Sequence, residues 1–224
     1  VVLFCDSSSL TTMSQIIPIF PLKLVLFPGS VFALHIFEER YKKMINLCLK
    51  DGSGFGIFLE GDDLIGEPGT YTTVKRILNE YDDGRKDIVV TGNERIHLID
   101  FERHPDGYFT AEVSIFDDIE NELDTGLLSQ VADILKTLVE RLKFNVGHRY
   151  YERLKSSPKP SFVIAEKAGL ELDDRLKVLR MRSENQRLLF LKRHLQEIES
   201  IVSATEKKQT IEWNDGYLDP GTLL

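Results

Sequence analysis

The sequence predicts an α+β protein in which a β-rich first part is followed by an α-helical second part. In residues 14–119, short apolar runs alternate with Gly, Pro and Asp turn signals, which is typical of a compact antiparallel barrel or sandwich. In residues 120–204, apolar residues recur at three- and four-residue steps, as on the buried face of packed helices. The charge changes at the same place: residues 14–119 carry 11 Lys and Arg against 18 Asp and Glu, whereas the following residues carry 17 against 17. We therefore place a domain boundary near residue 120.

Composition limits the class of protein. The 224 residues are 42% hydrophobic and 29% charged, which favours a globular chain with a substantial core. A net charge of −8 gives no global basic field for polyanions. The two cysteines, Cys5 and Cys48, are too few for a disulfide scaffold and fit a reducing, cytoplasmic location. No apolar run reaches the length of a membrane span, so we expect no membrane partner.

The β-rich part is expected to contain one helix. That helix covers residues 38–49, has acidic residues at its start and ends at Asp51-Gly52. We interpret residues 31–37 as a largely buried strand. Turns are expected at Asp82-Asp83-Gly84 and at Gly92-Asn93. The expected strands are 16–20, 31–37, 55–59, 71–81, 87–91, 95–101 and 108–116.

The second part is expected to be a helical bundle. Asp124 or Thr125 can cap a first helix, and Ser183 with Gln186 forms a capping box for the last one. Shorter helices are expected after Ser161 and after Asp173. The apolar stripes of the two long helices are Leu128, Val131, Leu135, Leu138 and Leu142, and Leu188, Leu191, Leu195, Ile198 and Val202.

Both ends of the chain are expected to lie outside the folded parts. Residues 1–13 are interpreted as disordered or as an extension ahead of Met13. Residues 205–224 turn polar and contain Gly and Pro, which indicates a C-terminal tail. Trp213, Tyr217 and Leu218 within this tail are candidates for docking on a partner or on a second copy.

Catalytic motifs are not found. None of the 15 glycines is followed by lysine, which excludes a P-loop. The histidines have no metal-ligand spacing on a common helix face, and we interpret His35 and His97 as partnered structural residues of apolar strands. Cys48 lies on the expected apolar stripe of a helix, which argues against a nucleophile. We therefore expect no catalytic residue, no metal and no cofactor.

One apolar segment stands out as a candidate binding surface. The run from Phe20 to Phe37 is denser in apolar residues than two strands require, and Pro21 and Pro28 interrupt it. Exposed apolar patches usually mark interaction sites. We therefore predict that polypeptide segments bind to the irregular connection made by Leu24, Val25, Leu26, Phe27 and Pro28.

The same region carries a family resemblance. Its residues Ile17-Pro18-Ile19-Phe20-Pro21-Leu22, Val25-Leu26-Phe27-Pro28-Gly29 and Leu34-His35-Ile36-Phe37-Glu38-Glu39-Arg40-Tyr41 resemble the opening of the N-terminal domain of Lon proteases. Later matches follow in the same order, at Gly69-Thr70, Asp83-Gly84-Arg85, Ile88-Val89-Val90-Thr91-Gly92, Tyr108-Phe109-Thr110-Ala111-Glu112-Val113 and the stretch from Leu179 to Leu188. The resemblance spans residues 16–201.

The resemblance implies a fold and a function. The implied fold is a PUA-like β pseudo-barrel followed by a helical bundle. The implied function is a non-catalytic module that binds exposed hydrophobic segments of unfolded or partly unfolded polypeptides, or that acts as an adaptor to a separate ATP-dependent protease. The 224 residues contain neither the ATPase nor the peptidase part of a Lon protease, as in stand-alone bacterial members. A homo-oligomer is compatible with this function.

Two alternatives stay open at this point. A PUA-like fold and the stretch from Lys143 to Arg193, with 13 basic against 6 acidic residues, are compatible with RNA binding. The charged residues of this stretch alternate with leucines at helical spacing, which instead favours the interpretation that they form the solvated face of a helical bundle. An autonomous peptidase is the second alternative, and the missing nucleophile–base pattern disfavours it.

Overall fold

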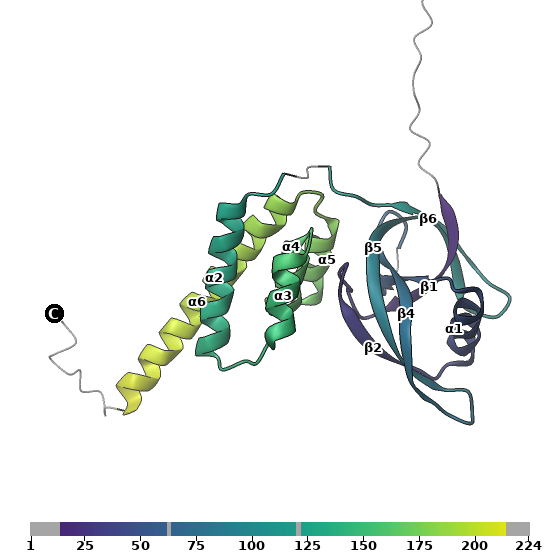
Figure 1. Cartoon of the computed structure of the whole chain (residues 1–224), viewed down its shortest axis with the longest axis horizontal. Helices are drawn as coiled ribbons and strands as arrows, with labels where there is room; N and C mark the ends of the chain where they lie inside the picture. The colour runs from purple at the N-terminus through teal and green to yellow at the C-terminus, as the bar shows by residue number, and fades with distance from the viewer. Residues whose placement is uncertain (1–13, 62–63, 120–121, 214–224) are drawn as a thin grey trace, which may run out of the picture. The chain divides into compact units, whose positions relative to one another are not determined.

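A computed structural model describes residues 14–61, 64–119 and 122–213, with side chains up to residue 206. These residues form two compact units (Figure 1). Among the described residues, the first unit comprises residues 14–117 and Glu171–Arg180, and the second comprises Asp118–Leu170 and residues 181–213. The combination of a six-stranded sheet with helices confirms the predicted α+β fold class.

The strands of the first unit close into a ring. The strand order is β2-β5-β4-β3-β1-β6, and an additional β5–β6 pairing closes five of these strands on themselves. β1 runs parallel to β3, and the other pairs are antiparallel. The strands are β1 (Gln15–Leu22), β2 (Val31–Ile36), β3 (Phe55–Leu59), β4 (Pro68–Glu80), β5 (Lys86–Arg103) and β6 (Phe109–Ile115).

The long strand β5 corrects one expectation. We predicted a turn at Gly92-Asn93, but β5 continues through both residues. A Cβ atom on Gly92 would lie 2.7 Å from the carbonyl oxygen of Phe27. Glycine is therefore required here for a close approach between two backbone segments rather than for a turn.

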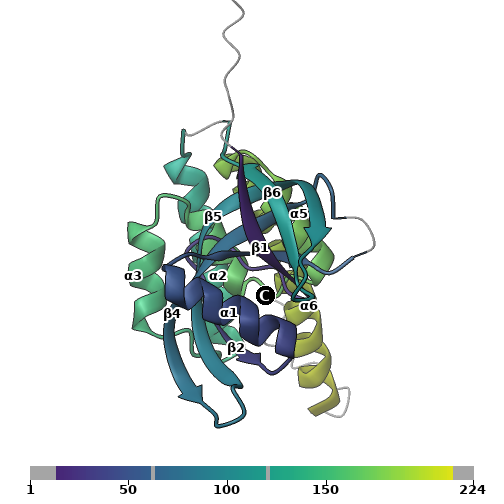
Figure 2. The same cartoon turned by 90° about the vertical axis from the view of Figure 1, so that its right-hand side faces the viewer.

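One helix packs on the sheet of this unit (Figure 2). This helix, α1 (Glu39–Asp51), ends at Gly52, whose φ of 65° is the left-handed conformation that glycine adopts without strain. Both the helix and its stop match the expectation from the sequence. The core between α1 and the sheet contains Tyr41, Met44, Ile45 and Cys48 from the helix and Phe20, Phe55, Ile57, Ile88 and Val90 from the strands.

A second helix belongs to the first unit although it lies far along the chain. The sequence pattern placed α5 (Leu172–Arg180) in the helical bundle, whereas the structure groups it with the strands. The guanidinium of Arg175 donates hydrogen bonds to the carbonyl oxygen of Val25, at 3.0 and 3.3 Å. The Leu179 carbonyl accepts a 2.7 Å hydrogen bond from Arg95. These polar contacts, which a hydrophobic periodicity does not reveal, fix α5 on the β-rich unit.

The second unit is a helical bundle. Its helices are α2 (Thr125–Arg141), α3 (His148–Ser156), α4 (Pro160–Lys167) and α6 (Glu184–Trp213). Asp124 caps α2 as predicted, since its carboxylate accepts a 2.9 Å hydrogen bond from the amide of Leu127. α6 continues past Thr205, where we expected the tail to begin. Tyr217 and Leu218 lie outside the described residues, as does the side chain of Trp213.

Two helices of the bundle run side by side in the same direction. Gln130 of α2 accepts a hydrogen bond from Lys192 of α6, and Arg141 of α2 donates to Ser203 of α6. Both partners therefore advance together along the two helices, so α2 and α6 are parallel (Figure 1). Among the described residues, no helix is both long enough and apolar enough to cross a bilayer.

Candidate functional site

The segment predicted to bind polypeptide is largely interior. Val25, Leu26 and Phe27 are 2%, 3% and 0% exposed, and only Leu24 and Pro28 are partly accessible. The expectation of an exposed apolar connection is therefore wrong for its three central side chains. In the described conformation they cannot contact another polypeptide.

Polar contacts hold this segment in the interior of the first unit. The hydroxyl of Thr70 donates a 2.5 Å hydrogen bond to the carbonyl oxygen of Leu26. The guanidinium of Arg175 lies 4.7 Å from the centre of the Phe27 ring, a cation–π contact, while it also binds the Val25 carbonyl. The irregular backbone therefore finds its partners inside the unit, which is required of a buried loop.

Exposed apolar side chains concentrate instead at one end of the sheet. Phe32 is 42% exposed, and Phe37 is 59% exposed. β2 pairs with the first half of β5, and that half pairs with the second half of β4, so these strands share one end of the sheet. Six exposed residues lie on the two faces of this end of the sheet, and we call them together the edge surface: Val31, Phe32, Phe37, Ile77, Leu78 and Tyr81.

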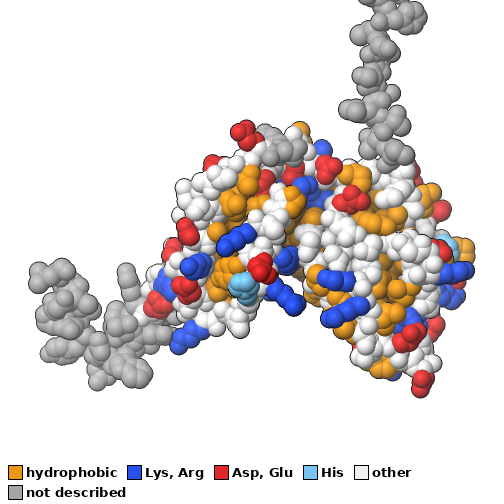
Figure 3. Space-filling view, in the orientation of Figure 1, with side chains coloured by type: hydrophobic (Ala, Val, Ile, Leu, Met, Phe, Trp, Pro, Cys, Tyr) orange, Lys and Arg blue, Asp and Glu red, His pale blue; other side chains and the backbone are white. Residues whose placement is uncertain are grey.

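The edge surface reverses a second expectation. The run 31–37 was predicted to be largely buried, but most of β2 is exposed. Figure 3 shows apolar surface, in orange, on the strand-rich unit between blue and red charged side chains. A continuous apolar run does not reveal whether a strand is central or at an edge, because this depends on the strand order. The neighbouring pair Ile77 and Leu78, between polar residues Arg76 and Asn79, is the signal in the sequence that could have indicated this surface.

A polar cluster links the part of the edge surface on β2 to the part on the hairpin between β4 and β5. The Asp87 carboxylate accepts hydrogen bonds from Asn79 (2.9 Å) and Tyr81 (2.8 Å) and lies 2.6 Å from Nδ1 of His35. Hydrogen bonds from Asn79, His35 and Tyr81 hold the pKa of Asp87 at about 2, below its ordinary value. The His35 ring also stacks against Phe37, with ring centres 5.9 Å apart. His35 is thus partnered as predicted, and its partners connect β2 with the hairpin between β4 and β5.

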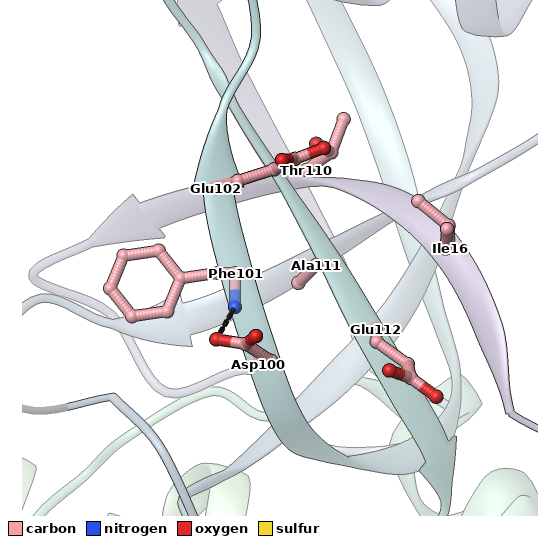
Figure 4. A pocket seen from close by; sticks show the side chains of 7 residues that line it. All are labelled: Ile16, Asp100, Phe101, Glu102, Thr110, Ala111 and Glu112. Carbon is pink, nitrogen blue, oxygen red and sulfur yellow. Dashed lines mark hydrogen bonds between the residues drawn. The ribbon is translucent and has the colours of Figure 1, made fainter.

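A shallow acidic pocket lies elsewhere on the same unit. It measures about 150 Å³ and is drawn in Figure 4. Asp100 of β5 and Glu112 of β6 are register partners, so two like charges face each other across the strands. The amide of Phe101 donates to the Asp100 carboxylate at 2.8 Å, while the Phe101 ring points away from it. The pocket is lined by Ile16, Asp100, Phe101, Glu102, Thr110, Ala111 and Glu112.

A wider hollow lies between α1 and the turn that joins β5 and β6. It measures about 570 Å³ and contains the ion pair between Lys43 and Asp106, at 2.7 Å. His104 stacks on the buried ring of Tyr108, with ring centres 4.3 Å apart. These side chains are satisfied by one another. We therefore place the candidate site at the edge surface rather than in this hollow.

The other residues considered for catalysis have structural surroundings. Cys48 is 1% exposed, its thiol donates to the carbonyl oxygen of Gly54 at 3.6 Å, and burial raises its pKa. A thiol in such surroundings is a poor nucleophile.

His97 stacks on Phe116, with ring centres 5.6 Å apart. Over the part of the chain that the structure describes, no three His, Cys, Asp or Glu side chains are grouped to hold a metal ion.

The family follows from the whole matched region. Residues 16–197 match the family described as the ATP-dependent protease La (LON) substrate-binding domain, and the chain belongs to this family. This confirms the resemblance that the sequence motifs indicated.

Solved structures agree in fold. The chain is similar to a Lon N-terminal domain protein from Xanthomonas campestris, with a TM-score of 0.63, 24% identity, and coverage of 79% of this chain and 96% of that chain. It is also similar to the N-terminal domain of the Mycobacterium avium complex Lon protease, with a TM-score of 0.65, 16% identity, and coverage of 81% and 98%. At these identities the likeness concerns the fold.

Proposed function

We propose that this chain is a non-catalytic substrate-recognition module that binds polypeptide segments with exposed apolar side chains. The family supports recognition of a substrate, since it is described as a substrate-binding domain. The observation that carries the finer proposal is the edge surface, where Phe32 and Phe37 are 42% and 59% exposed at one end of the sheet. Unfolded polypeptides expose apolar side chains that folded proteins bury. An apolar binding surface therefore binds unfolded polypeptides in preference to folded ones.

The energetic basis is burial of apolar area. Removing apolar surface from water contributes about 25 cal/mol per Å², and aromatic anchors dominate many interfaces. Side chains that are already half-buried are pre-organised, which reduces the entropy lost on binding. Phe32 and Phe37 are therefore the expected anchors of the edge surface.

We further propose that the chain acts as an adaptor. In this role it presents a bound polypeptide to a separate ATP-dependent protease in the cytoplasm. The support is the family description, which assigns the substrate-binding domain to an ATP-dependent protease.

RNA binding is not favoured by the helical unit. Arg187 is fully buried, and Arg153 forms hydrogen bonds to Glu166 at 2.7 and 3.0 Å. Basic residues that neutralise carboxylates inside a unit do not contact phosphates. These two of the 13 basic residues of the stretch therefore serve ion pairs within the chain.

The test is a binding titration with a permanently unfolded polypeptide. We expect fluorescently labelled, reduced and carboxymethylated lactalbumin to bind the full chain. The double variant Phe32→Ser/Phe37→Ser should weaken this binding about tenfold or more, because two anchors lose their apolar area. Ile16→Ser is the matched control, because Ile16 is 76% exposed but lies outside the edge surface. Equal binding by the double variant and the wild type would contradict the proposal.

A further inference from the structure

We propose that the open edge of β2 binds an extended segment of another polypeptide as an added β-strand. This inference rests on the proposed function and specifies its mode: backbone pairing along β2, with the edge surface receiving side chains. The occupant is an extended, neutral or basic segment with apolar residues at alternate positions.

The topology leaves β2 with one open side. Five strands form the closed ring, and β2 is the strand that ends the order, with β5 as its partner. β2 and β6 lie on the same side of β5, β2 along residues 86–91 and β6 along residues 96–103. β2 thus presents its outer edge beyond the point where the ring closes.

The register identifies the backbone groups that face outward. The amide of Gly92 donates a 3.0 Å hydrogen bond to the carbonyl oxygen of Ser30, and Val31 then pairs with Thr91 in the same register. In antiparallel strands, hydrogen-bonded and non-hydrogen-bonded pairs alternate. The N–H and C=O groups of Val31, Ala33 and His35 therefore point away from β5. Three donor–acceptor sets at every second residue are what one edge of an extended peptide matches.

β2 lacks the features that usually protect an edge. Its six residues contain no proline, and its pairing with β5 runs from Val31 to Ile36 without a register shift. Natural edges are commonly guarded by lysine, proline or a bulge. The single ionisable side chain of β2, His35, is held by Asp87 at 2.6 Å. An edge that is both regular and uncharged is suited to pairing.

Charge and side chains select the occupant. Residues 14–117 and 171–180 of the first unit carry 14 Lys and Arg against 20 Asp and Glu, a net of −6, which disfavours an acidic segment. Val31 is 48% exposed and Phe32 is 42% exposed, on opposite faces of β2. Apolar residues of the added strand therefore find an apolar neighbour on either face.

The test removes one outward donor and leaves the ladder intact. In Ala33→Pro the proline ring removes the backbone N–H of residue 33, which faces away from β5. Edge strands tolerate proline where the N–H faces solvent. Ala33→Ser keeps the N–H and is the matched control. The probe is a fluorescein-labelled nine-residue peptide of alternating Val and Thr with a Lys at each end. We expect Ala33→Pro to weaken binding of this peptide at least tenfold and Ala33→Ser to stay within twofold.

A second arm leaves the protein unchanged. The same peptide, N-methylated at three consecutive central residues, cannot offer a full set of donors from either edge. We expect binding of the methylated peptide to be at least tenfold weaker. If Ala33→Pro does not fold, this measurement alone tests strand addition. Unchanged binding of the methylated peptide, or of a folded Ala33→Pro variant, overturns strand addition.

The outcomes separate this inference from the proposed function. If the Phe32→Ser/Phe37→Ser variant loses unfolded lactalbumin while N-methylation has no effect, the apolar surface binds clients but strand addition is wrong. If wild type binds neither probe, the proposed function itself is wrong. If the chain instead self-associates through β2, with a dimer that Ala33→Pro dissociates and the peptide does not, the proposed occupant is wrong.

Discussion

Arg187 and Asp118 form a two-point ion pair inside the helical unit, with Nη1 and Nη2 donating to the two carboxylate oxygens at 2.7 and 2.6 Å. Asp118 is the first residue of this unit, and Met181 is the residue at which the chain returns to it. The same guanidinium donates to the Met181 carbonyl at 2.8 Å and to Glu184 at 2.5 Å. One buried cation therefore ties together both points where the chain enters the unit.

Replacing this cation is expected to be costly. Arg187→Met removes the guanidinium that neutralises the buried carboxylates of Asp118 and Glu184 and leaves Asp118 only the longer 3.8 Å pair with Lys159, which should lower the stability of the unit by about 3–5 kcal/mol. Arg180→Met is the control, because its ion pair with Glu67 is half exposed and contributes little. Urea unfolding followed by circular dichroism measures both. Similar midpoints for the two variants would refute the structural role of Arg187.

A buried hydroxyl offers the opposite prediction. The Tyr150 hydroxyl is buried and has no hydrogen-bond partner among the described residues, and burial raises its pKa. An unsatisfied buried polar group costs about 1–3 kcal/mol. Tyr150→Phe should therefore leave stability unchanged or raise the melting temperature, whereas Tyr150→Ala should lower it. A Phe variant that is destabilised as much as the Ala variant would show that the hydroxyl has a partner.

The Asp87 cluster predicts a pH dependence. The pKa of Asp87 is about 2 in the folded chain and about 3.9 in an unfolded one, so its ionised form favours folding. This stabilisation is complete above about pH 5 and is lost as the pH falls from about 4 to about 2. Asp87→Asn should therefore be less stable than wild type at pH 7, and this difference should shrink as the pH falls through about 4 towards 2. Urea midpoints across this range provide the measurement, and a gap that stays constant with pH would argue against the cluster.

Gly92 predicts a steric effect. In Gly92→Ala the new Cβ would lie 2.7 Å from the Phe27 carbonyl oxygen and 3.0 Å from Thr70, so backbone or side chain must shift. Such overpacking typically costs about 1–3 kcal/mol. Gly61→Ala is the control, because a Cβ there meets no atom within 4 Å. Thermal unfolding of the two variants compares them, and equal melting temperatures would contradict the close approach.

Local signals in the sequence predicted most of the elements. The Asp82-Asp83-Gly84 hairpin, the stop of α1 at Gly52 and the cap at Asp124 all follow from short-range chemistry. Gly84 and Gly52 have φ values of 81° and 65°, which only glycine adopts readily. Such signals depend on a few neighbouring residues, so they can be recognised without the fold.

Burial was harder to predict because it depends on distant partners. Phe27 and Phe32 lie in the same apolar run, yet Phe27 is fully buried and Phe32 is 42% exposed. The difference arises from Arg175, far along the chain, which covers Phe27, and from the strand order that leaves β2 at an edge. Neither the contact with Arg175 nor the strand order can be read from the run itself. For this reason the segment predicted to be exposed is buried, and the strand predicted to be buried is exposed.

The most direct test of recognition at the edge surface is hydrogen–deuterium exchange of the full chain, with and without saturating unfolded lactalbumin. Amides that face solvent on an open edge exchange quickly, and pairing or coverage slows them. We expect bound polypeptide to slow exchange in the segment from Val31 to Phe37 and in the segment from Ile77 to Tyr81. Unchanged exchange in both segments while the polypeptide is bound, with protection appearing on α2 or α6 instead, would contradict this recognition mode.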